Sequence, residues 1–159
     1  MPNLTAALKE KLNGSQKVVV LGIGSELRGD DSAGILVAKK LEKEKLSGLT
    51  VLIGGTAPEN LTGEIKRLQP SHLIIVDAAD MKEAPGTIRL VDPDEVGGFS
   101  FSTHSLPIKV LINYLQEHFH FQVLLIGIQP KNISFGNPLS PEIEDAAETA
   151  AQMIAACFN

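Results

Sequence analysis

Residues 18–31 have the sequence VVVLGIGSELRGDD, in which a continuous apolar run is followed by a short polar loop. An uninterrupted β-branched run is typical of a strand that is buried on both faces of a parallel sheet. The segment from Ser32 to about Lys45 carries apolar residues at helical spacing. This order of strand, loop and helix predicts the first unit of an α/β fold.

The rest of the chain continues this alternation. Helical spacing predicts helices over residues 4–12, 58–68, 106–118 and 142–156, and apolar runs predict strands over residues 50–53, 72–76 and 123–128. Residues 87–91 alternate polar and apolar side chains, which indicates an edge or antiparallel strand. We therefore predict a three-layer α/β/α sandwich around a mostly parallel sheet of about five strands.

The composition is that of an ordinary globular protein. The 159 residues are 43% hydrophobic and 21% charged, which argues against a disordered chain, and we interpret residues 1–159 as a single domain. A net charge of −5 does not favour nucleic acid as a partner. No stretch approaches the ~20 apolar residues of a membrane span. We therefore expect no nucleic-acid partner and no membrane insertion.

The chain ends carry weak signals of location. Lys9 and Lys11 precede any apolar run, so the start of the chain does not resemble a secretory signal. Cys157 is the only cysteine, which excludes an internal disulfide and fits a reducing compartment. We therefore expect a cytoplasmic protein.

Three side chains that suit a divalent metal stand beside breaks in the regular pattern. Asp31 closes the loop after the first strand, Asp77 follows the apolar run of residues 73–76, and His104 lies in a segment rich in Ser and Thr. Ligands bind beyond the carboxyl ends of the strands in such sheets, so Asp31 and Asp77 are expected at the same edge. Strand order alone does not place His104 there.

Each of these residues also has an ordinary structural interpretation. Either Asp30 or Asp31 can cap the following helix, and Asp77 can cap a turn made with residues 78–80. His104, before another predicted helix, can be a solvated or capping side chain. For each of these residues taken singly, a functional role and a purely structural role therefore both remain open.

Other motifs point less clearly to a site. Gly22 and Gly24 suggest a dinucleotide-binding turn, but Leu27 stands where the third glycine of that fingerprint is needed, so a tight turn is favoured. His118 and His120 have metal-like spacing but lie at the opposite edge of the predicted sheet. Cys157 has no obvious base nearby in sequence. Among enzymatic interpretations, a metal or carboxylate mechanism is favoured.

Several blocks, taken in order, resemble the hydrogenase maturation endopeptidases. They are residues 22–34 (GIGSELRGDDSAG), 54–60 (GGTAPEN), 73–81 (LIIVDAADM), 85–89 (PGTIR), 102–107 (STHSLP) and 125–130 (LIGIQP). The resemblance runs from about residue 17 to residue 155, so residues 1–16 form a leading helical extension outside it. The blocks at 57–60 and 127–130 are most similar to the branch that serves formate-hydrogenlyase-type hydrogenases.

The resemblance implies a function, a fold and a site. Such proteins remove a short C-terminal extension from the large-subunit precursor of a nickel–iron hydrogenase after nickel insertion. Their sheet has five strands, one of them antiparallel. By position, Asp31, Asp77 and His104 would recognise the nickel. For the catalytic step, our own hypothesis is that Asp31 or Asp77, or a metal-bound water, activates the attacking water. The family often has Glu where Asp31 stands.

In this interpretation the nickel belongs to the substrate, and no resident cofactor is required. Two other classes of function stay open. One is a non-catalytic nickel checkpoint that binds the precursor, and the other is a nucleotide-binding α/β domain.

Overall fold

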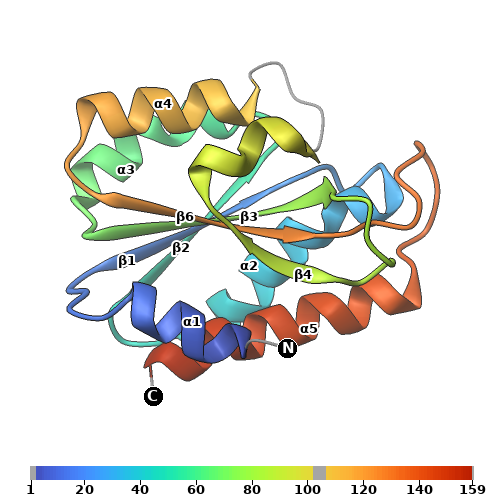
Figure 1. Cartoon of the computed structure of the whole chain (residues 1–159), viewed down its shortest axis with the longest axis horizontal. Helices are drawn as coiled ribbons and strands as arrows, with labels where there is room; N and C mark the ends of the chain where they lie inside the picture. The colour runs from blue at the N-terminus through green and yellow to red at the C-terminus, as the bar shows by residue number, and fades with distance from the viewer. Residues whose placement is uncertain (1–2, 102–106, 159) are drawn as a thin grey trace.

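The fold is one sheet with helices on both faces, described for residues 3–101 and 107–158 of a computed structural model (Figure 1). Four strands run parallel in the order β2-β1-β3-β6, and two short strands pair antiparallel, β4 with β6 at the sheet edge and β5 with β3. This confirms the predicted three-layer sandwich and the antiparallel strand near residues 87–91. The strands are β1 (Val18–Ile23), β2 (Leu49–Gly55), β3 (His72–Asp80), β4 (Ile88–Val91), β5 (Ser100–Phe101) and β6 (Gln122–Ile128).

The helices divide into two layers. One layer contains α1 (Leu4–Lys11), α2 (Ala33–Glu44) and α5 (Pro141–Ala155), and the other contains α3 (Thr62–Leu68) and α4 (Ile108–His118) (Figure 1). Alternate residues of β1 serve the two layers, since Val18 and Val20 pack in the first core cluster and Val19 and Leu21 in the second. The described residues also contain four 3₁₀ helices: η1 (Gly29–Ser32), η2 (Pro58–Leu61), η3 (Pro93–Gly98) and η4 (Ala156–Phe158).

The leading helix α1 belongs to the core. Its Leu8 and the following Leu12 are 1% and 6% exposed and pack in the same cluster as α2 and α5. Burial of these two leucines contributes to stability, so residues 3–12 are part of the folded unit. None of the helices in the described residues is long and apolar enough to cross a membrane.

Helix α2 lies very close to the sheet because glycines face each other at the contact. A Cβ atom on Gly34 would stand 2.2 Å from the carbonyl oxygen of Val76, and one on Gly22 would stand 2.5 Å from the carbonyl oxygen of Gly34. Both distances are far below van der Waals contact, so no other residue fits without a backbone shift. Gly22, one of the two glycines that suggested a nucleotide turn, therefore serves the packing of the helix on the strands.

Two predicted boundaries were wrong. The helix predicted over residues 58–68 is η2 followed by α3, and the hydroxyl of Thr62 donates to the carbonyl of Glu59 at the junction. The strand predicted to end at Val76 continues to Asp80, because it stays paired with β6 as far as Ala78 and with β5 at its end. Asp77 is therefore inside a strand, and the expectation that it follows one is corrected.

Candidate active site

The carboxyl edge of the parallel strands brings the turn that carries Asp31 against β3. The 3₁₀ helix η1, which contains Asp31, contacts β3, and the backbone of Gly34 meets that of Val76, the residue before Asp77. Asp31 and Asp77 are 2% and 0% exposed. The structure thus has two buried carboxylates on adjacent elements at the edge where ligands bind in such sheets.

Asp31 is held by the loop that leads to it. The backbone N–H of Ser25 donates to Asp31 Oδ2 at 3.1 Å, and the N–H of Asp31 donates to the carbonyl of Arg28 at 3.0 Å. The alternative role of Asp31 as a cap of the following helix does not apply, because Ser32 occupies the N-cap position of α2. Its carboxylate instead closes the loop of residues 25–31 on itself.

Asp77 is fully buried on β3, near the carboxyl ends of the parallel strands. It stands in β3 opposite Gly127 of β6, where a Cβ atom would already be 3.0 Å from Met81 Sδ. The proposed turn with residues 78–80 does not exist, since those residues continue the strand. Burying a carboxylate costs free energy unless it has partners, and both Asp31 and Asp77 do engage partners.

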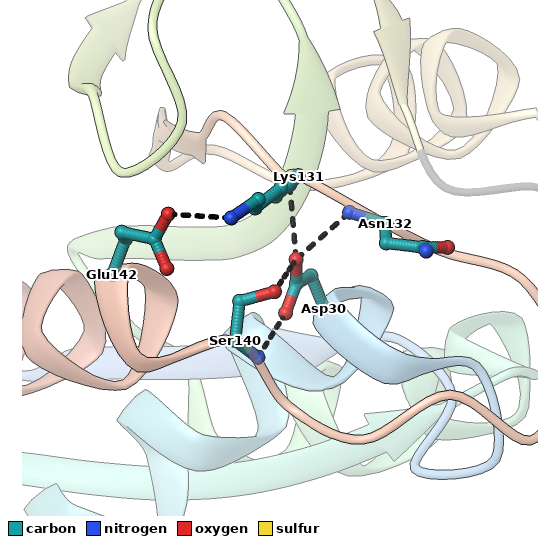
Figure 2. A network of polar contacts seen from close by, with 5 residues as sticks. All are labelled: Asp30, Lys131, Asn132, Ser140 and Glu142. Atoms are coloured by element: carbon teal, nitrogen blue, oxygen red, sulfur yellow. Dashed lines mark hydrogen bonds and ion pairs between the residues drawn. The ribbon is translucent and has the colours of Figure 1, made fainter.

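Asp30 forms the most extensive polar network of the region (Figure 2). Its fully buried carboxylate accepts the backbone N–H groups of Lys131 and Asn132 at 2.9 Å each, and both the N–H and the hydroxyl of Ser140 at 2.7 and 2.8 Å. The Lys131 ammonium pairs instead with Glu142 at 3.0 Å. Asp30 therefore ties the loop after β6 to η1 and is not a helix cap, so that alternative role does not apply to it either.

Two further polar residues at this edge were not singled out from the sequence. Glu59 in η2 has a buried carboxylate oxygen and engages a partner. Gln129, 7% exposed, accepts the N–H of Met81 at 2.6 Å and so joins the end of β6 to the chain after β3. Both stand shortly after a strand, and that position is the signal that could have identified them.

The third predicted ligand, His104, lies outside the described residues. Among residues 3–101 and 107–158, no three His, Cys, Asp or Glu side chains come together in a way that could hold a metal ion. His118 and His120 are therefore not part of such a group, and they line a pocket at the opposite edge of the sheet. There His118 Nδ1 is 2.9 Å from the carbonyl oxygen of Tyr114, and the two rings are 4.4 Å apart.

His72 and Cys157 are two other side chains whose chemistry could serve catalysis. Burial lowers the pKa of the His72 imidazole, an effect that a backbone contact with Lys11 partly opposes. Burial raises the pKa of the Cys157 thiol, and the charge of Lys9 partly opposes this. Neither group is a poised nucleophile or base, because the thiol is disfavoured as a thiolate and His72 opens β3 at the amino end.

Comparisons with known proteins agree with one another. A sequence model of the family described as hydrogenase maturation protease matches residues 35–157. The chain is 41% identical to the hydrogenase 3 maturation protease of Escherichia coli K12 over 137 residues, which cover 86% of this chain and 87% of that protein.

Solved structures give the same result. The NiFe hydrogenase maturation protease HycI of Thermococcus kodakarensis superposes with a TM-score of 0.87 at 32% identity, covering 96% of this chain and 98% of that one. The endopeptidase HycI of Escherichia coli superposes with a TM-score of 0.77 at 40% identity, covering 86% and 87%. Similarity therefore extends across the sheet, both helical layers and the carboxyl edge.

Proposed function

Because the chain belongs to the hydrogenase maturation protease family and is an endopeptidase of that kind, we propose that it removes the C-terminal extension of a nickel–iron hydrogenase large-subunit precursor after nickel insertion. The observation that carries the proposal is the pair of buried carboxylates, Asp31 and Asp77, on adjacent elements at the carboxyl edge. The cytoplasmic location expected from the sequence stays a prediction.

Asp31 and Asp77 are the proposed nickel-recognising residues, together with His104. Carboxylate oxygens and an imidazole nitrogen suit nickel, and thiolates of the precursor can supply its other ligands. In this proposal the metal arrives with the substrate and leaves with it, so the endopeptidase needs no cofactor of its own. Binding to the nickel then ensures that the endopeptidase cuts only a precursor that already carries the metal.

The reaction adds one water molecule across one peptide bond. The water oxygen becomes part of the new carboxyl group, its proton ends on the amine of the released peptide, and the C–N bond breaks. A carboxylate within reach of the water can accept its proton as the attack proceeds. We assign this role to Asp31 or Asp77, whose burial keeps bulk water from competing.

The nucleotide-binding alternative finds no support at the glycine turn. The N–H groups of this turn are already engaged within the chain, since that of Gly24 donates to the carbonyl of Gly55 at 3.0 Å and that of Ser25 donates to Asp31 Oδ2 at 3.1 Å. Phosphate binding needs N–H donors at such a turn, whereas carbonyl oxygens repel it.

The test separates the endopeptidase from a non-catalytic checkpoint. Purified protein is mixed with nickel-loaded and with nickel-free precursor, and the precursor mass is followed over time. The proposal predicts loss of the C-terminal peptide from the nickel-loaded sample alone. Binding without any change in mass would support the checkpoint, and equal cleavage of both samples would refute nickel recognition.

A further inference from the structure

Exposed apolar side chains gather beside the candidate site. Among the described residues, six large hydrophobic side chains are exposed, and three of them lie on two loops at the carboxyl edge: Leu27, Ile133 and Phe135 at 65%, 42% and 72% exposure. Phe135 is the most exposed of the six. Leaving a phenylalanine in water forgoes the free energy that its burial would supply.

The two loops form one unit, which we call the rim unit and define as residues 27–31 and 131–140 (Figures 1 and 2). The N–H of Gly136 donates to the carbonyl of Leu27 at 2.8 Å, and the N–H of Asp30 donates to the carbonyl of Asn132 at 2.9 Å. Gly29, at a φ of +55°, lies so close that a Cβ atom would stand 2.6 Å from the Asn132 carbonyl oxygen. The apolar residues thus project from the same unit that carries Asp31.

Hydrogen bonds from buried and loop side chains order the rim unit. The buried Asp30 carboxylate fixes residues 131, 132 and 140, and the side-chain amide of Asn137 donates to Asn132 Oδ1 at 2.6 Å. Residues 131–136 are all exposed and have no regular secondary structure. Ordering such a loop costs conformational entropy, and a loop ordered in advance binds a partner without incurring that cost again.

We propose that Leu27, Ile133 and Phe135 form the surface on which the folded precursor protein docks against an apolar patch of its own. The reason for proposing this partner is that the rim unit is continuous with the candidate active site. Leu27 is four residues from Asp31, and both belong to the loop of residues 25–31, which is closed by the N–H of Ser25 donating to the Asp31 carboxylate. A protein whose tail reaches Asp31 therefore covers the rim unit, and apolar contacts there contribute binding energy remote from the cleaved bond.

The inference rests on the proposed function, and its test is arranged so that the two can fail separately. The unaltered chain is first shown to process a nickel-loaded large-subunit precursor from its own source organism. Leu27→Ser and Phe135→Ser are then compared with it. The matched control is Val110→Ser, which alters a side chain of similar exposure, 47%, on α4 over the opposite face of the sheet.

Docking on the rim unit predicts a higher KM with an unchanged kcat. Each single variant should raise KM about tenfold, the size expected for an interface anchor, while kcat stays within about twofold and the melting temperature is unchanged. Val110→Ser should match the unaltered chain. If both variants keep the KM of the unaltered chain, or lower kcat alone, the docking surface is refuted while the endopeptidase stands.

Self-association is the competing use of the same surface. Sedimentation velocity of the unaltered chain and of Phe135→Ser reports it directly. A dimer that dissociates on the substitution, with an unchanged KM, overturns the inference and assigns the rim unit to a second copy. Failure of the unaltered chain to process any precursor overturns the proposed function, and this inference with it.

Discussion

Replacing Asp30 by Asn tests whether the buried carboxylate holds the rim unit. All four of its partners are donors, three of them backbone N–H groups. An amide in the same place sets its own NH₂ group against at least one of those N–H groups in either orientation. If the NH₂ takes the place of Oδ1, it opposes the N–H of Ser140, and otherwise it opposes those of Lys131 and Asn132.

Two opposing effects determine how much stability the substitution removes. Hydrogen bonds to a charged group contribute about 1.5–3 kcal/mol each, but removing the charge also returns several kcal/mol of desolvation cost. Lys131 and Asn132 lie on an exposed loop, so water replaces part of what is lost. We expect Asp30→Asn to lower the free energy of unfolding by about 3 kcal/mol, which lowers the melting temperature by about 6–12 °C in a chain of this size.

Urea denaturation followed by circular dichroism measures this free energy. The matched control is Glu142→Gln, which removes the exposed ion pair with Lys131 from the same network. It should leave the free energy of unfolding nearly unchanged, because exposed ion pairs contribute little to stability. An Asp30→Asn protein as stable as this control would refute the reasoning that the carboxylate organises the loop.

Three further predictions concern other parts of the structure. Because the pKa of His72 is lowered in the folded chain, the unfolded chain binds more protons near and below pH 6.5, and stability falls as the pH drops through that range. The difference in melting temperature between pH 8 and pH 5 should therefore be smaller for His72→Gln than for the unaltered chain. Cys157→Ala should keep full processing activity, and the raised pKa of the thiol predicts slower alkylation by iodoacetamide at pH 8 than for glutathione. Gly34→Ala should lower stability by about 3 kcal/mol, because the new methyl group meets backbone that has no room to yield, whereas Gly63→Ala, with nothing within 4 Å, should be neutral or slightly stabilising in the same melts.

The sheet could be predicted from the sequence because its signal is local. Continuous apolar runs identified β1, β3 and β6, and the alternating pattern of residues 87–91 identified the antiparallel edge strand. The end of β3 was predicted too early because its last residues, Ala78 to Asp80, are not β-branched. They are held in the strand by pairing with β6 and β5, and no local pattern records those partners.

The candidate site was predictable in its location but not in its contacts. Parallel strands deliver their ends to one edge, so Asp31 could be placed there from strand order. The role of Asp30 could not be deduced, because its partners lie at least 101 residues away in the chain. A helix cap is the simplest local use of an aspartate before a helix, and the long-range network displaced it.

Processing of nickel-loaded precursor by Asp77→Asn is the most direct test of the central claim, that the buried carboxylates act on a nickel-bearing substrate. The amide keeps the size of the side chain and removes its charge, and Asp94→Asn, at an exposed position in η3, is the matched control. We predict that Asp77→Asn stays folded by circular dichroism but releases the C-terminal peptide at least about a hundredfold more slowly, the scale of a lost general base. A rate within about fivefold of the unaltered chain would contradict the claim.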